Sequence, residues 1–145
     1  MKAKDILKSK GSEVFTISES KPMVSAMEVL VNNNIGVLLV IDTKAKITGI
    51  ISERDILRAI HQYPDNFSNL LVNDFMTKRI IYADFEDDMD YIENIMTSNR
   101  IRHLPILSNK TLVGLISIGD VIKANLSDQR FENKYLIDYI GGNVK

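Results

Sequence analysis

The sequence predicts an α/β (α+β) fold of two β-α-β-β-α repeats that pack sheet to sheet with pseudo-two-fold symmetry. The first observation is that GIISERD (49–55) recurs as GLISIGD (114–120), 114 − 49 = 65 positions later. The second is that six apolar positions of the first half recur 66 positions later. Since a repeat of about 60 residues buries too little surface to fold alone, the two repeats should form one unit.

The composition is that of an ordinary globular protein, with a net charge of −1 and 45% apolar residues in a chain of 145. This charge excludes electrostatic attraction to nucleic acid or to an anionic membrane as a main activity. The absence of cysteine excludes disulfides and thiolate chemistry. No run of ~18 apolar residues and no signal peptide is present, so we expect a cytoplasmic protein without a membrane anchor.

The first repeat follows from β-branched runs and one helical stripe. Met23, Ala26, Met27 and Leu30 have the i, i+3, i+4, i+7 spacing of a half-buried helix, with Pro22 suited to its first turn. The remaining elements are expected to be a strand within 14–22, strands at 37–42 and 46–51 around a turn at 43–45, and a helix at 52–62.

The second repeat reproduces this order. Its expected elements are a strand at 79–83, a helix carrying Met89, Ile92 and Met96, strands at 104–107 and 111–116, and a helix at 117–126. The six apolar positions that recur are Met23/Met89, Ala26/Ile92, Leu30/Met96, Ile35/Ile101, Leu38/Leu104 and Val40/Ile106.

The ends of the repeats predict how the chain is divided. We expect residues 2–9 to form an N-terminal helix that crosses to the far repeat, and residues 72–77 to open the second repeat as AKDIL opens the first. We place the first repeat with its N-terminal helix at 1–67, the second at 68–127, and a C-terminal helix and tail at 128–145, with the helix itself at 131–143.

The repeated serine and aspartate allow two interpretations. In the structural one, Ser52 and Ser117 are helix N-caps, and Asp55 and Asp120 complete capping boxes. In the functional one, the serine and the adjacent backbone N–H groups bind a phosphate, while the aspartate accepts hydrogen bonds from the two hydroxyls of a ribose.

Charged residues elsewhere give weaker signals. Arg102 and His103 stand before a buried strand and either face solvent or bind a phosphate, whereas Gly36 and Val37 occupy the matching place in the first repeat. Arg54 and Arg58 are most simply exposed helix charges.

Metal binding and catalysis have little support in the sequence. The acidic run at 84–90 lacks the glycine and ligand order of a calcium loop and opens a helix that favours negative charge. Two histidines without cysteine are too few for a typical zinc site. No nucleophile elbow, P-loop or dinucleotide motif is present, so we expect neither a catalytic residue nor a metal.

Together, GIISERD and GLISIGD, NNIGVLLVID and NRIRHLPIL, and the openings DIL and DFMT resemble the tandem cystathionine-β-synthase (CBS) domain pair, or Bateman module. The resemblance covers nearly the whole chain and is closest to free-standing bacterial or archaeal proteins made only of the pair. It implies a regulatory module that senses AMP, ADP, ATP, NAD(H) or S-adenosylmethionine and acts on an unidentified protein partner in trans. It also implies a homodimer.

The resemblance also implies two nucleotide sites of unequal strength. The stronger one should be made by Asp120, Ser117, Arg102, His103, Gly119, Ile118 and Thr16. The weaker one should be made by Asp55, Ser52, Arg54, Gly36, Val37 and Tyr82. Two alternatives remain open: a structural dimerisation module without a ligand, and an enzyme that processes nucleotides.

Overall fold

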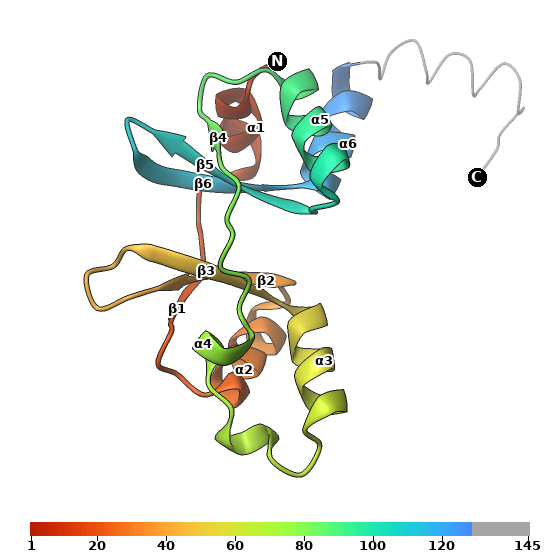
Figure 1. Ribbon diagram of the computed structural model, residues 1–145. Helices are drawn as coiled ribbons and strands as arrows, with labels where there is room; N and C mark the ends of the chain where they lie inside the picture. Colours follow the sequence, from red (N-terminus) through yellow and green to blue (C-terminus); the bar gives the residue numbers. More distant parts are fainter. Residues whose placement is uncertain (129–145) are drawn as a thin grey trace, which may run out of the picture. The chain divides into compact units, whose positions relative to one another are not determined.

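The computed structural model describes residues 1–128, which contain two three-stranded sheets and six α-helices (Figure 1). These residues divide into two packed units. The first unit is residues 13–81, and the second unit joins residues 1–12 to residues 82–128. The mixed α/β class and the two β-α-β-β-α repeats are therefore confirmed.

The first unit has one sheet with its helices on one face (Figure 1). β1 runs parallel to β2, and β2 runs antiparallel to β3. The elements are β1 (Thr16–Ser18), α2 (Met23–Asn33), β2 (Val37–Ile41), β3 (Ile47–Ser52), α3 (Glu53–Gln62), the 3-10 helix η1 (Phe67–Asn69) and α4 (Val72–Phe75).

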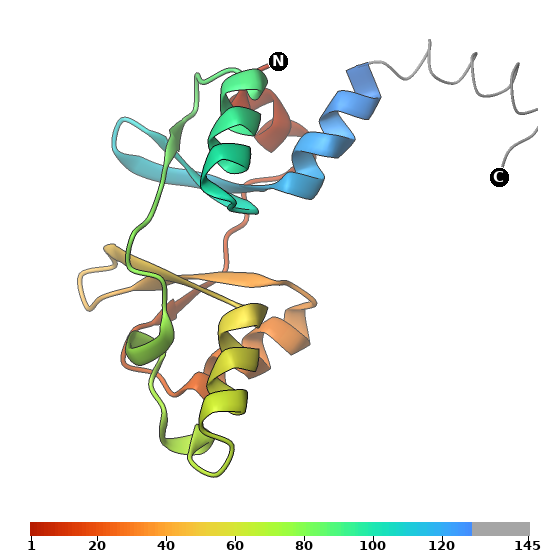
Figure 2. The ribbon, with the colours of Figure 1, turned by 45° about the vertical axis from the view of Figure 1, so that its right-hand side comes forward.

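The second unit repeats the pairing, with β4 parallel to β5 and β5 antiparallel to β6. Its elements are α1 (Ala3–Lys10), β4 (Ala83–Asp84), α5 (Met89–Asn99), β5 (His103–Ser108), β6 (Thr111–Ser117) and α6 (Ile118–Asp128). In both ribbon views α5 and α6 lie side by side on the face of the sheet that α1 also covers (Figure 2).

The core of each unit is built from the positions that the repeat predicted. Five of the six equivalent pairs are buried in both repeats, whereas Ile35 and Ile101 are half-buried. Met27, the fourth member of the predicted stripe, is also only half-buried. Each fully buried Val, Leu, Ile or Met side chain contributes about 1.5–3 kcal/mol, so these positions supply much of the stability of the fold.

Most predicted elements are confirmed to within a residue or two, and one is wrong. The strand predicted at 79–83 is reduced to Ala83–Asp84, which pairs with Ile106 and Leu107. The β-branched and aromatic residues before it have no ladder partner, and strand propensity without a partner does not make a strand. The predicted C-terminal helix at 131–143 lies outside the described residues.

The helices α1 and α4, which precede the two repeats in the sequence, each pack in the unit of the other repeat. α1 precedes the first repeat but packs in the second unit, as predicted, and α4 precedes the second repeat but packs in the first unit. Backbone hydrogen bonds fix α4 there, from Val72 N to Lys21 O at 2.9 Å and from Asn73 N to Glu19 O at 3.0 Å. The packed units are thus offset from the repeats of the sequence.

The repeated glycines explain how closely these helices approach. A Cβ on Gly114 would lie 2.6 Å from Leu7 Cδ2, and one on Gly49 would lie 2.5 Å from Met76 Sδ and 3.0 Å from the backbone oxygen of Thr77. Only a residue without a side chain leaves room for these contacts. Leu7 on Gly114 and Met76 on Gly49 are therefore equivalent contacts.

No helix among residues 1–128 has both the length and the apolar character required to span a bilayer.

Candidate functional site

Ser117 and Asp120 form a capping box at the start of α6. The backbone N–H of Ser117 donates to Asp120 Oδ2 at 2.8 Å, and the backbone N–H of Asp120 donates to Ser117 Oγ at 3.1 Å. The same box starts α3, where Ser52 N lies 2.8 Å from Asp55 Oδ2 and Asp55 N lies 3.4 Å from Ser52 Oγ. The structural interpretation of the repeated motif is thus confirmed.

The capping hydrogen bonds leave acceptor positions open on both Asp55 and Asp120. In both boxes the caps bind Oδ2, and within residues 1–128 Oδ1 accepts no hydrogen bond. An ionised carboxylate has about four acceptor positions, so each aspartate keeps capacity for donors from a ligand.

Strand pairing brings Arg102 and His103 to the start of α6. His103 pairs with Ser117 across β5 and β6, and the backbone N–H of Ile118 donates to Arg102 O at 2.8 Å. Arg102 is exposed and His103 is half-buried. The predicted residues Arg102, His103, Ser117, Ile118, Gly119 and Asp120 therefore gather at one corner of the second unit.

The equivalent corner of the first unit has the same backbone but carries the acidic Glu53 beside the exposed Arg54. Val37 pairs with Ser52, and the backbone N–H of Glu53 donates to Gly36 O at 3.0 Å. The carboxylate of Glu53 lies 3.5 Å from the position of a Cβ on Gly36. An acidic side chain thus stands where the second unit has Ile118, and glycine stands where it has Arg102.

The remaining predicted residues are Thr16, Tyr82 and Arg54. Thr16 belongs to the first unit and Tyr82 to the second, so each lies in the unit opposite the aspartate it was predicted to assist, and their roles stay predictions. Arg54 is exposed on α3. Arg58, one turn later, reaches Asp55 instead, with its NH1 4.0 Å from Oδ1.

Lys10 was missed by the sequence analysis. Its Nζ donates to Asp120 Oδ2 at 2.6 Å and to Leu115 O at 2.8 Å. Burial raises the pKa of the Asp120 carboxyl, but the hydrogen bonds from Lys10 and Ser117 and the charge of Lys10 outweigh it, so this pKa lies below its ordinary value. Asp120 therefore stabilises the fold at neutral pH, and this contribution is lost as the pH falls below about 4 through the lowered pKa.

The position of α1 is the signal that would have revealed Lys10. Leu7 packs on Gly114, which places the last turn of α1 beside Leu115 and the start of α6. The sequence shows a basic residue at the end of this helix but not which aspartate it faces.

The acidic segment before α5 has its own partners. Glu86 forms ion pairs with Lys2 at 3.2 Å and with Lys4 at 3.0 Å, and Asp87 accepts a hydrogen bond from the backbone N–H of Asp84. No group of three metal-ligating side chains occurs within residues 1–128.

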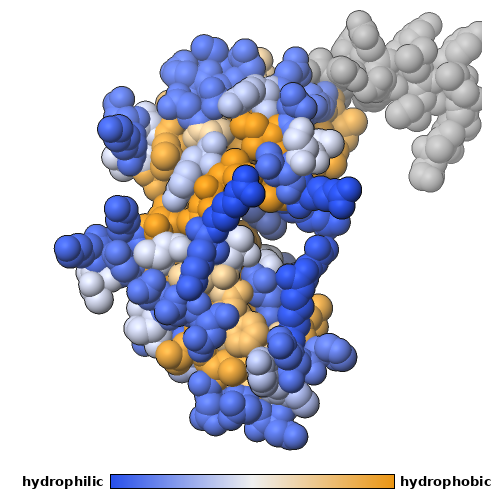
Figure 3. All heavy atoms as spheres, viewed as in Figure 1, coloured by the Kyte–Doolittle hydropathy of each residue, from blue (hydrophilic) through white to orange (hydrophobic). Residues whose placement is uncertain are grey.

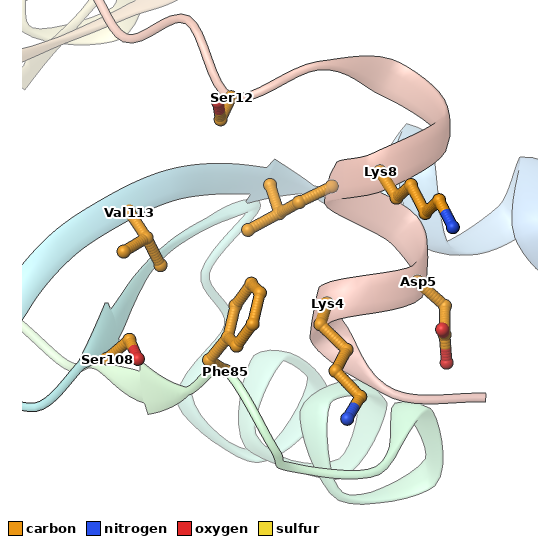
Figure 4. A pocket seen from close by; sticks show the side chains of 8 residues that line it. Lys4, Asp5, Lys8, Ser12, Phe85, Ser108 and Val113 are labelled. Carbon is orange, nitrogen blue, oxygen red and sulfur yellow. The ribbon is translucent and has the colours of Figure 1, made fainter.

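A groove of about 620 Å³ runs between α1 and the sheet of the second unit. Figure 4 shows Phe85 and Val113 on the sheet side, with Lys4, Asp5 and Lys8 on α1. Its volume would suit a small molecule. None of the residues predicted to bind the nucleotide lines it.

The family follows from the sequence itself. The family model described as "CBS domain" matches residues 3–62 and 72–127. The chain belongs to the CBS domain family. The two matched segments are the two repeats, so the chain is a CBS pair.

Known relatives agree with this assignment. The "CBS domain-containing protein CBSX3, mitochondrial" of Arabidopsis thaliana is 32% identical over 146 residues, which cover 95% of this chain and 71% of that protein. The solved CBS-domain protein ATU1752 from Agrobacterium tumefaciens is 34% identical, with a TM-score of 0.83 over 86% of this chain and 99% of that one. The match covers less of some other relatives, for example 42% of the protein MJ1225 of Methanocaldococcus jannaschii.

Two more distant structures share the fold and hold ligands. CBSX2, solved in complex with AMP, is 20% identical with a TM-score of 0.73 over 88% of this chain and 98% of that one. The CBS domain pair of MJ0100, solved with 5-methylthioadenosine and S-adenosyl-L-methionine, is 24% identical with a TM-score of 0.74 over 88% of this chain and 98% of that one.

Proposed function

We propose that this CBS pair is a regulatory module that binds an adenine nucleotide, with its tighter site at the start of α6. The observation that carries the proposal is the corner where Asp120, Ser117 and Arg102 meet on one hairpin and one helix start. Support comes from structures of the same fold solved with AMP, with methylthioadenosine and with S-adenosylmethionine.

Each residue of the corner has a role suited to one part of a nucleotide. Asp120 accepts hydrogen bonds from the ribose hydroxyls through the lone pairs that the capping box leaves. Ser117 and the backbone N–H of Gly119 lie at a helix start, which favours an anion. Arg102, exposed beside them, supplies a guanidinium that matches phosphate in charge and shape.

Charge distinguishes the two sites. The corner at α3 retains Asp55 and Ser52 for a ribose, but it has Glu53 and Gly36 in place of Ile118 and Arg102. A carboxylate near the phosphate position repels an anionic ligand. The α6 site therefore fills first, and the α3 site holds a nucleotide weakly or prefers a neutral nucleoside.

We propose binding without catalysis, with the bound state passed to a protein partner. The two candidate serines cap helices, and the sequence carries no nucleophile elbow, P-loop or dinucleotide motif. A purely structural module would use Asp55 and Asp120 for helix capping and for nothing else. A nucleotide-processing enzyme would convert the bound nucleotide, which chromatography after overnight incubation would detect.

Ligand-free protein should gain stability with adenine nucleotides. A ligand that binds only the native state stabilises it by RT ln(1 + [L]/Kd), about 2.7 kcal/mol at a hundredfold excess over Kd. AMP, ATP and NADH should raise the melting temperature by several degrees in a thermal-shift assay, and GMP should raise it less. No shift with any adenine compound would refute the proposed function.

We also propose that the chain forms a homodimer through α3 and α6. Leu57 and Ile122 occupy equivalent positions in the two repeats and are 68% and 55% exposed. Figure 3 shows apolar surface in orange on both units where these helices lie. Exposed apolar side chains repeated at equivalent positions fit the self-complementary surface of a dimer.

Light scattering should give a dimer mass at about 50 µM, above the dissociation constants usual for such interfaces. Leu57→Asp combined with Ile122→Asp should give a folded monomer, because two carboxylates cannot be buried unpaired at the interface. Thr43→Asp, an exposed change in the turn between β2 and β3, is the control and should leave the dimer intact. A wild-type monomer at this concentration would contradict the homodimer.

A further inference from the structure

The ion pair between Lys10 and Asp120 occupies the carboxylate that the proposed function assigns to the ribose. Lys10 Nζ lies 2.6 Å from Oδ2, which also accepts a hydrogen bond from Ser117 N at 2.8 Å. A second bond at 2.8 Å joins Nζ to Leu115 O. Oδ1 remains open to one ribose hydroxyl, but a hydroxyl that approaches Oδ2 must compete with an ammonium group.

The outcome of this competition depends on the charge of the ligand. A hydroxyl that replaces the ammonium exchanges an ion pair for a hydrogen bond from a neutral donor, so a neutral nucleoside gains little from Oδ2. A nucleotide also brings a phosphate, which gives the displaced ammonium a new anionic partner. The side chains of Lys10 and Asp120 are 34% and 21% exposed, so a ligand can reach both.

The fold keeps Lys10 within reach of such a phosphate. Lys10 is the last residue of α1, and the contact of Leu7 with Gly114 fixes this helix on the sheet. The lysine stem is flexible and its ammonium carries three donors, of which two are used in this structure. The ammonium can therefore leave Asp120 without any movement of α1.

Building on the proposed function, we propose that Lys10 selects anionic nucleotides: it neutralises Asp120 when the site is empty and turns to the phosphate when a nucleotide binds. The α6 site then favours AMP and related phosphates over adenosine and methylthioadenosine, which offer the ammonium no new partner. It disfavours S-adenosylmethionine, whose sulfonium would stand near an ammonium.

The first unit supplies a matched control. Leu7 and Met76 make equivalent contacts, 76 − 7 = 69 positions apart, and the same sequence offset relates Lys10 to Arg79, which lies beyond the end of α4 at Phe75. Arg79 is exposed, and the structure shows no ion pair between it and Asp55.

The test is calorimetry of ligand-free protein with AMP, adenosine and S-adenosylmethionine, using Lys10→Met and Arg79→Met. Methionine keeps an apolar stem of similar length but removes the charge. Lys10→Met should weaken AMP about tenfold, leave adenosine unchanged or up to about threefold tighter, and tighten S-adenosylmethionine. Arg79→Met should leave the tight binding of all three ligands unchanged, and Lys10→Arg should keep the preference for AMP over adenosine.

Equal weakening of AMP and adenosine by Lys10→Met would show that Lys10 has a merely structural role. Unchanged AMP binding would show that Lys10 has no role in binding. Either result would overturn the selection by Lys10 and leave the proposed function standing. Wild-type protein that binds none of the three ligands would overturn both. If Lys10→Met does not fold, Lys10→Gln gives the same comparison.

Discussion

Asp120→Ala is expected to weaken AMP binding by about a hundredfold or more, because the ribose loses a charged acceptor for its two hydroxyls. Hydrogen bonds to charged groups contribute about 1.5–3 kcal/mol each, and 2.7 kcal/mol corresponds to about a hundredfold in affinity. Calorimetry on ligand-free protein measures this directly. Since alanine also removes the Asp120 half of the capping box and the ion pair with Lys10, the melting temperature of the variant has to be recorded alongside.

The first repeat provides the control for this expectation. Asp55→Ala removes the equivalent carboxylate and the equivalent half of the capping box, at the corner that carries Glu53. It should leave the tight phase of AMP binding in place. A loss of the tight phase in Asp55→Ala, with Asp120→Ala unaffected, would show that the two sites have been assigned in the wrong order.

Arg102→Ala should weaken the binding of AMP far more than that of adenosine, since only AMP carries a phosphate.

Leu7→Ala is expected to lower the free energy of unfolding by about 2–5 kcal/mol, measured by urea denaturation. Leu7 is 4% exposed and is the side chain through which α1 contacts Gly114. Removing most of a buried leucine costs the transfer free energy and leaves a cavity. Gly114→Ala should cost about 1–3 kcal/mol by itself, because its Cβ would lie 2.6 Å from Leu7 Cδ2.

The double variant shows whether the two residues touch in solution. With Leu7 reduced to alanine, the added Cβ of Gly114→Ala enters vacated space. The loss of unfolding free energy in the double variant should therefore be clearly smaller than the sum of the losses in the two single variants. Additive costs would mean that α1 does not lie on β6 as the structure has it. The predicted crossing of this helix to the second repeat would then be wrong.

The core and the caps could be predicted from the sequence because both are local patterns repeated twice. Positions such as Met23 and Met89 carry helical periodicity, and the S-x-x-D spacing of a capping box lies within one turn. The strand predicted at 79–83 was wrong because a strand depends on a partner elsewhere in the chain. The same non-local dependence left open which unit α4 packs in.

The site was predicted in part for the same reason. Arg102 and Ser117 could be brought together because they flank one predicted hairpin, and the two strands of that hairpin pair in the structure as expected. Lys10 and Asp120 are 110 positions apart, and only the packing of α1 on the second unit joins them. The carboxylate of Glu53 was missed because its importance appears only beside Gly36.

The most direct test of the central proposal is an NMR titration of ligand-free protein with AMP below one equivalent. Backbone amide signals of Ile118, Gly119 and Asp120 should shift first, because their N–H groups lie at the corner proposed to hold the nucleotide. Those of Glu53, Arg54 and Asp55 should shift only after the first site is filled. Shifts that begin at Glu53 to Asp55, or a spectrum that AMP leaves unchanged, would contradict the account.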